Sequence, residues 1–169
     1  MQHQNRINFF AEHFGKKQCT GIELGVAAGT FSSQMLSVCE NLTLYSVDAW
    51  AGDSGHDANQ MATAKRQLQK FGNRSIVIQN FFEEVLSDFE QEFFDFIYID
   101  GYAHTGQNDG QTLRSWIPKL KKKGIFSGHD YDPAWQPTIK QVDAFAEEYN
   151  FKINVIEDNP FSSWYIIND

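Results

Sequence analysis

The chain has 169 residues, of which 41% are hydrophobic and 15% aromatic. This length fits one domain spanning residues 1–169, and a chain of this size and composition buries a substantial core, which excludes disorder as its main state. The formal net charge is −8. That charge repels phosphate backbones and anionic lipids, so it argues against nucleic acid and membrane surfaces as partners.

The sequence shows no pattern typical of a membrane span, a signal peptide or a cysteine-based metal site. No apolar run approaches the roughly 18 residues that a membrane span requires, and Arg6, Glu12 and Lys16 interrupt the region where a signal peptide would be apolar. We therefore expect a cytoplasmic protein. Cys19 and Cys39 form neither a CxxC pair nor a metal-ligand spacing, which favours two reduced cysteines.

The first half of the chain alternates between helical and strand patterns. In chain order it predicts a helix over residues 7–14, a strand over 20–24, a helix over 31–38, a strand over 42–47, a helix over 57–71 and a strand over 75–78. Asp57 and Gln60 have the spacing of a capping box, in which two side chains satisfy free amides at a helix start.

The second half continues the alternation and ends differently. It predicts a helix over residues 82–89, a strand over 94–99, a helix over 113–120, a strand over 124–128, a helix over 139–149, and strands over 151–156 and 163–167. The strand over 94–99 is apolar on both faces, as a central parallel strand must be. The last two strands are too close in sequence for a parallel crossover, so they pair as a hairpin. The lysines of residues 119–123 are interpreted as the solvated end of a helix.

These elements predict a doubly wound, Rossmann-like α/β sheet of seven strands, mostly parallel, with an antiparallel hairpin strand at the C-terminus. In such sheets ligands bind beyond the carboxyl ends of the strands. The turn over residues 23–29, ELGVAAG, has small residues that let a ligand approach the backbone. Asp48 ends the second strand, where a carboxylate can accept both hydrogen bonds of a ribose diol.

The turn and Asp48 together favour a nucleoside ligand, with a plain strand–helix turn and a surface aspartate as the alternative. The turn has neither the GxGxxG pattern of dinucleotide sites nor the phosphate-loop motif. An NAD-dependent oxidoreductase is therefore a weaker hypothesis. A non-catalytic cofactor- or nucleotide-binding module is another alternative.

Four motifs resemble those of class I S-adenosylmethionine-dependent methyltransferases: GIELGVAAG over residues 21–29, Asp48, FIYIDG over 96–101 and GIFSGHDY over 124–131. More narrowly, they resemble the small bacterial group of sugar and macrolide O-methyltransferases, methyltransferase family 24, with catechol O-methyltransferase as a distant relative. The resemblance spans about residues 20–168. It implies methyl transfer from S-adenosylmethionine to a hydroxyl oxygen of a small-molecule acceptor. The implied cofactor-binding residues are Glu23, Gly25, Ala27, Gly29, Asp48, Ala49, Asn80, Phe81 and Asp100.

Asp100, His129 and Asp130 follow two strands that are neighbours in this topology. Carboxylate oxygens with one imidazole suit Mg²⁺ or Mn²⁺, and in the distant catechol relatives acidic or amide residues at matching places bind Mg²⁺. A site without metal is an equal alternative, in which Asp100 orders the loop, His129 acts as a base and Asp130 caps the next segment.

Methyl transfer to an alcohol requires alignment together with either a base or a metal. The catalytic candidates are His129, His104 and Asp100, and we rank His129 above His104 because His104 lies one residue off the family's spacing. Imidazole ordinarily titrates near pH 6.5, so it can accept a proton in the cell. Loops over 48–57, 102–110 and 131–137 carry aromatic and polar residues suited to a sugar-like acceptor: Trp50, Asp53, Tyr102, Asn108, Asp109, Asp132 and Trp135. His56 lies in the polar stretch over residues 52–57, which is interpreted as a surface loop, with a mobile lid as the alternative. A second subunit is an open alternative source of specificity.

Overall fold

Seven strands form one sheet in the order β3-β2-β1-β4-β5-β7-β6. The computed structural model describes residues 5–52 and 55–169. The parallel strands are β1 (Cys19–Leu24), β2 (Leu42–Asp48), β3 (Ser75–Gln79), β4 (Phe94–Ile99) and β5 (Leu120–Gly128). Two antiparallel strands, β7 (Ser163–Ile167) and β6 (Asn154–Ile156), extend the sheet beyond β5. The predicted fold, including the central place of β4 and the antiparallel ending, is confirmed.

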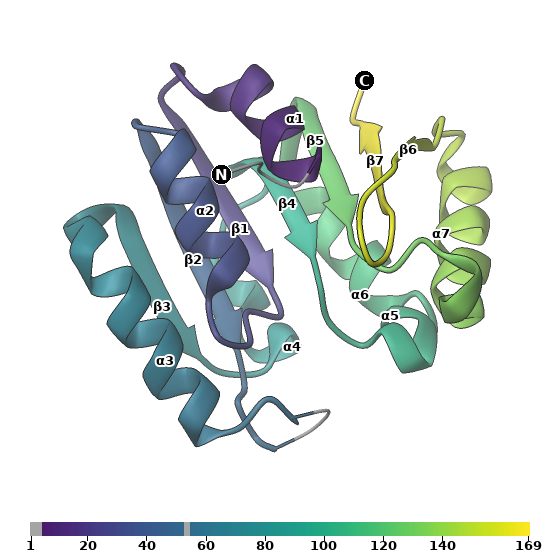
Figure 1. Cartoon of the computed structure of the whole chain (residues 1–169). Coiled ribbons are helices and arrows are strands. Elements are labelled where there is room, and N and C mark those ends of the chain that lie inside the picture. The colour runs from purple at the N-terminus through teal and green to yellow at the C-terminus, as the bar shows by residue number, and fades with distance from the viewer. Residues whose placement is uncertain (1–4, 53–54) are drawn as a thin grey trace.

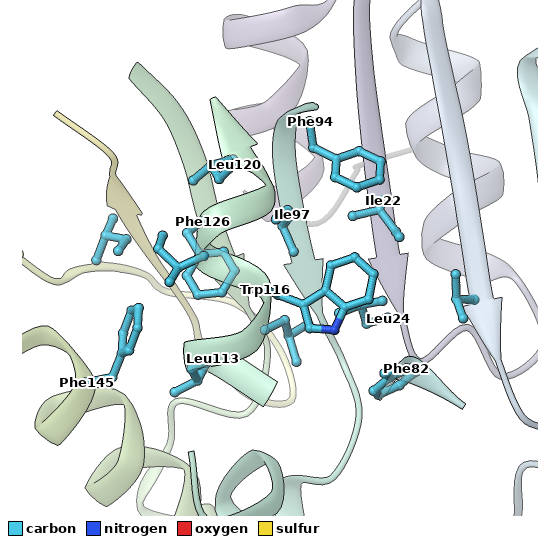
Figure 2. Close-up of a cluster of buried hydrophobic side chains, with 14 of the residues drawn as sticks. Ile22, Leu24, Phe82, Phe94, Ile97, Leu113, Trp116, Leu120, Phe126 and Phe145 are labelled. Carbon is cyan, nitrogen blue, oxygen red and sulfur yellow. The ribbon is translucent and has the colours of Figure 1, made fainter. Parts of the chain in front are cut away.

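Helices cover both faces of this sheet (Figure 1). They are α1 (Asn5–Phe14), α2 (Thr30–Val38), α3 (Ala58–Leu68), α4 (Phe82–Val85), α5 (Gly106–Asp109), α6 (Gln111–Trp116) and α7 (Gln136–Tyr149). On one face α1, α2 and α3 bury an apolar cluster that includes Phe10, Met35 and Leu68. On the other face α4, α6 and α7 pack around Trp116, with β1 and β4 beneath them, as Figure 2 shows.

Alternation along the strands decides which side chains reach which layer. Ile22 and Leu24 of β1 belong to the cluster around Trp116, whereas Glu23 between them bonds to Ser32 of α2. The strand order reverses between β1 and β4, and the crevice above their carboxyl ends is therefore the expected ligand site.

The lysine-rich segment differs from its sequence-based prediction. Strand β5 begins at Leu120, so Lys121, Lys122 and Lys123 lie in a strand and not at the end of a helix. A short 3₁₀ helix over Ile117–Lys119, with Pro118 near its start, ends the preceding helix early. Periodicity did not separate the two alternatives, because Leu120 is buried in either case.

Other boundaries shift by smaller amounts. Asp57 caps α3 by accepting hydrogen bonds from the amides of Asn59 and Gln60, but Gln60 Oε1 makes no hydrogen bond within the described chain, so the motif is a simple N-cap. The helix predicted over 82–89 is a single α-turn, α4, followed by a 3₁₀ turn. The strand predicted from residue 151 begins at Asn154.

None of the helices formed by the described residues is long and apolar enough to cross a bilayer. Cys19 and Cys39 are both buried free thiols. Burial raises the pKa of Cys19 to about 12 and that of Cys39 to about 11, which keeps both as unreactive thiols.

Candidate functional site

A cavity of about 540 Å³ opens above the carboxyl ends of all five parallel strands. Its size lies within the roughly 300–1,000 Å³ usual for small-molecule sites. The lining residues come from the loops that follow the strands: Gly25, Asp48, Ala49, Trp50, Ala51, His56, Phe81, Phe82, Asp100, Gly101, Tyr102, Ala103, His104, Thr105, Asp130 and Trp135.

Gly25 is the residue at which β1 turns toward α2. Its φ of +97° lies in the region that only glycine adopts easily. A Cβ at this position would collide with the backbone carbonyl of Asp100, because the ends of β1 and β4 approach each other closely here. The glycine thus serves two purposes: it permits the turn, and it lets the backbone at the end of β1 line the cavity without a side chain.

Asp48 is 4% exposed, yet it reaches the cavity wall. Its Oδ2 accepts hydrogen bonds from the amides of Val26 at 2.8 Å and Ala27 at 2.9 Å, and its Oδ1 accepts one from Trp50 at 2.8 Å. His56 Nδ1 lies 2.6 Å from the same Oδ2 and donates to it. Burial favours the protonated acid, but these four donors outweigh burial and lower the pKa of Asp48. The carboxylate is therefore ionised and firmly oriented.

Glu23 occupies a different position from the one its motif implied. It is 1% exposed and accepts a hydrogen bond from Ser32, which also bonds to Ser46 at 2.7 Å. Burial raises its pKa well above the ordinary value. Because its side chain points into the α2 layer, Glu23 lies beneath the cavity and does not line it.

The remaining implied cofactor residues divide into two groups. Ala49 and Phe81 line the cavity, and Phe81 is 46% exposed there. Ala27, Gly29 and Asn80 are absent from the lining of the described cavity. Ala27 acts through its backbone, since its carbonyl accepts a 2.8 Å hydrogen bond from Trp50 Nε1 and its amide donates to Asp48.

Asp100, His129 and Asp130 converge where β4 and β5 end. One ligand atom from each lies within 4.8 Å of the others, with His129 Nδ1 3.5 Å from Asp100 Oδ1 and 3.2 Å from Asp130 Oδ1. His129 Nε2 lies 3.1 Å from the carbonyl of Phe161 and donates to it. Burial lowers the pKa of His129, but the two carboxylates outweigh it and raise the pKa to about 9.

His104 and Trp135 form another part of the cavity wall. Their rings meet edge to face at 4.9 Å, and Trp135 also contacts Phe161 at 5.7 Å. His104 is exposed at the mouth of the cavity. Trp135 Nε1 is buried and has no hydrogen-bond partner within the described part of the chain.

The structure also corrects the expected polar residues of the loops. Asn108, Asp109 and Asp132 do not line the described cavity; Asp132 instead caps a 3₁₀ turn by accepting from the amide of Ala134 at 3.0 Å. Asp53 lies outside the described residues. His56, interpreted as a surface residue, lines the cavity, and no signal in its Gly- and Asp-rich loop indicated this contact.

A protein-family model described as "Methyltransferase domain" matches residues 22–131. The matched segment begins in β1 and ends just after β5, so it contains all five strand ends that line the cavity. Comparison with curated protein sequences finds no match.

Several solved structures share the fold over nearly the whole chain. An O-methyltransferase from Bacillus cereus in complex with SAH superposes with a TM-score of 0.75 at 13% identity, covering 98% of this chain and 80% of that chain. A precorrin-6y C5,15-methyltransferase from Geobacter metallireducens gives 0.72 at 13%, covering 99% and 89%. A SAM-dependent methyltransferase from Aquifex aeolicus gives 0.69 at 16%, covering 96% and 88%. At these identities the likeness establishes a common fold.

Proposed function

We propose, from the premise that this chain belongs to the methyltransferase domain family, that it moves the methyl group of S-adenosylmethionine to a hydroxyl oxygen of a small, polar, sugar-like acceptor. The family assignment removes the oxidoreductase alternative and makes S-adenosylmethionine the methyl donor. The residues fit that cofactor, because an ionised Asp48 at the end of β2 can accept hydrogen bonds from a ribose diol, and Gly25 at the end of β1 lines the same cavity without a side chain.

The observation that carries the oxygen acceptor is the convergence of Asp100, His129 and Asp130 at the cavity edge. Two carboxylates and an imidazole suit Mg²⁺ or Mn²⁺. The bond from His129 Nε2 to Phe161 fixes Nδ1 as the nitrogen facing the carboxylates, as an outer-shell partner does for a metal-ligating histidine. A bound ion would act as a Lewis acid toward the acceptor hydroxyl.

The same geometry changes the ranking of the two histidines. Both ring nitrogens of His129 are engaged, one by a carbonyl and the other by carboxylates. His104 lines the cavity and is exposed to an entering acceptor. We therefore propose His129 as an ion ligand or positioning residue and His104 as the base that receives the hydroxyl proton.

A sugar-like acceptor is supported by Trp135. Trp135 lines the cavity, and an indole face can stack on a pyranose ring. Asp130 at the same cavity supplies an acceptor for a sugar hydroxyl. A small polar molecule also agrees with the net charge of −8, which disfavours nucleic acid and membrane partners. A cytoplasmic location stays a prediction, and a homodimer stays an alternative.

The decisive experiment incubates the protein with S-adenosylmethionine carrying a labelled methyl group and a panel of acceptors. The panel contains free sugars, macrolides, catechols and primary amines. Each acceptor is tested with Mg²⁺, with Mn²⁺ and with a chelator. Labelled ether products from sugars or macrolides support the proposal. Products from amines alone would overturn oxygen transfer, and cofactor binding without any product would support a non-catalytic binding module.

A further inference from the structure

Residues 106–110, which contain α5, form a turn of backbone wound in the left-handed sense. Their φ angles lie between +51° and +75°, and the ψ angles of Gly106, Gln107 and Asn108 are 51°, 54° and 57°. The amide of Gly110 donates to the carbonyl of Gly106 at 2.9 Å, which closes the turn. L-amino acids adopt this conformation at a cost in free energy, so single left-handed residues are found in many turns but consecutive ones are rare.

The surrounding structure holds this turn against α7. The two elements pack side by side (Figure 1), and a Cβ on Gly106 would collide with the carbonyl oxygen of Pro137 in α7. Thr105 caps the turn, since its hydroxyl accepts from the amide of Asn108 at 3.0 Å. Backbone strain persists only where surrounding contacts impose it, and it occurs mostly at functional sites. The left-handed turn thus marks a segment whose position matters.

Gln107 carries the buried side chain of this turn. It is 3% exposed, and its Nε2 donates to Oγ1 of Thr138 at 3.2 Å. Thr138, in α7, is fully buried, and its hydroxyl donates in turn to the carbonyl oxygen of Ala103 at 3.3 Å. The amide of Gln107 also donates to the carbonyl oxygen of Tyr102 at 2.8 Å. These bonds join the turn and α7 to the backbone just before His104.

His104 follows Ala103 directly and lines the cavity. It belongs to the short 3₁₀ helix Ala103–Thr105, and its exposed side chain contacts the ring of Trp135 at 4.9 Å. Trp135 immediately precedes α7, so the bond between Thr138 of α7 and the Ala103 carbonyl fixes His104 relative to Trp135. A base must lie within hydrogen-bond reach of the proton that it receives, so a small shift of His104 would slow the transfer.

We propose that Gln107 and Thr138 are positioning residues that hold His104 where it receives the proton of the acceptor. The left-handed turn presents Gln107 to Thr138, and Thr138 bonds to the backbone beside His104. Neither residue lines the described cavity, so both act through His104. This proposal rests on the proposed role of His104 as the base, and it is independent of a divalent ion.

The first test follows the position of His104 by NMR and needs no acceptor. The chain has five histidines, and the ring signal missing from His104→Gln identifies His104. The indole ring of Trp135 shifts this signal away from that of a free histidine, because aromatic rings perturb the chemical shifts of nearby protons. Thr138→Val removes the hydroxyl at nearly constant volume and should move the signal toward the free value, whereas Thr138→Ser retains the hydroxyl and should keep the wild-type signal. An unchanged signal in Thr138→Val, or an equal change in Thr138→Ser, would overturn the proposal.

Thr112→Val is the matched control. Thr112 is 3% exposed, and its Oγ1 has no hydrogen-bond partner among residues 5–52 and 55–169. This variant should leave the His104 signal unchanged, and a shift like that of Thr138→Val would show that loss of any buried threonine hydroxyl moves His104, which contradicts the proposal. Gln107→Met covers the case in which Thr138→Val does not fold. It removes the donor to Thr138 and should also move the His104 signal, so an unchanged signal would count against the proposal.

Methyl-transfer rates connect the position of His104 to the reaction. In single-turnover assays with the acceptor panel, Thr138→Val should lower the rate roughly ten- to hundredfold and change the dissociation constant of S-adenosylhomocysteine by less than about threefold. In the His104→Gln variant the same substitution should have no further effect, because the group that it positions is gone. If His104→Gln keeps the wild-type rate, the proposed base is wrong and the positioning role is overturned with it. If His104→Gln loses the rate and Thr138→Val keeps it, the base stands and the positioning role alone is overturned.

Discussion

His56 Nδ1 lies 2.6 Å from Asp48 Oδ2 and is the only side-chain donor among the four that the structure describes on this carboxylate. A carboxylate offers about four lone-pair sites. Four protein donors therefore occupy the group that is expected to bind ribose. The three backbone amides are fixed by the turns, so a ribose hydroxyl gains access most easily by displacing His56.

The first prediction follows from this competition. His56→Ala should bind S-adenosylhomocysteine a few-fold more tightly than wild type, because the ribose no longer displaces a hydrogen bond worth about 1 to 2 kcal/mol, and the ligand-free protein should lose about that much stability. Calorimetry and urea unfolding measure the two effects. His13→Ala is the control, since His13 Nδ1 lies 2.8 Å from the Phe9 carbonyl, remote from the cavity. Weaker binding by His56→Ala would instead show that His56 contacts the cofactor.

The second prediction concerns acid stability. Although burial opposes ionisation of Asp48, its hydrogen bonds lower its pKa below the ordinary value of about 3.9. The unfolded state then binds the proton more tightly, so Asp48 contributes stability above pH 4 that is lost as the pH falls through the folded pKa. Asp48→Asn should therefore be less stable than wild type at pH 7, with a smaller gap at pH 3, as measured by urea unfolding.

The control for acid stability is Asp88→Asn, which changes an exposed aspartate. It should leave the difference between pH 7 and pH 3 as in wild type. A gap for Asp48→Asn that stays constant over this range would mean that the folded protein does not favour the ionised form of Asp48.

The sequence was sufficient to predict the sheet and the part of the site that the sheet positions. Gly25, Asp48 and Asp100 all line one cavity because parallel strands place their carboxyl ends at the same edge, so strand assignment alone brings them together. The direction of the Glu23 side chain was harder to predict. The alternation of side chains along β1 places it in the α2 layer beneath the cavity, whereas the motif implied a contact with the cofactor.

The remaining features depend on contacts that periodicity does not encode. His56 reaches Asp48 from an irregular loop, and the only constraint on its direction is the loop conformation itself. Arg6 bonds through its amide to Asp158, 152 positions away in sequence. Arg6 is buried in the first turn of α1, next to the buried Ile7. A single charged residue at the start of a helix is easily interpreted as exposed to solvent. Such pairs become visible only when helix and loop positions are known together.

The third prediction concerns the divalent ion. Wild type should bind Mn²⁺ with a measurable calorimetric signal, and exhaustive chelation should reduce methyl transfer to the identified acceptor. Asp130→Asn should weaken Mn²⁺ binding at least about tenfold, because it removes one of two charged ligand groups. Asp95→Asn is the control, since Asp95 pairs with Lys121 away from the cavity lining. Full activity after chelation would exclude an ion requirement and leave the three residues as a hydrogen-bonded cluster.

The last prediction separates the roles of the two histidines. A base that receives the acceptor proton typically contributes 10² to 10⁴ in rate. His104→Gln should therefore lower the single-turnover methyl-transfer rate by roughly that factor while leaving S-adenosylhomocysteine affinity near wild type, because His104 stands at the cavity mouth beside Trp135. His129→Gln should mainly weaken Mn²⁺ binding, since its ring lies between Asp100 and Asp130, and excess Mn²⁺ should restore part of its rate. Excess Mn²⁺ should not restore His104→Gln. If His129→Gln alone loses the rate at saturating Mn²⁺ and His104→Gln does not, the proton passes to His129 and the assignment of the base must be reversed.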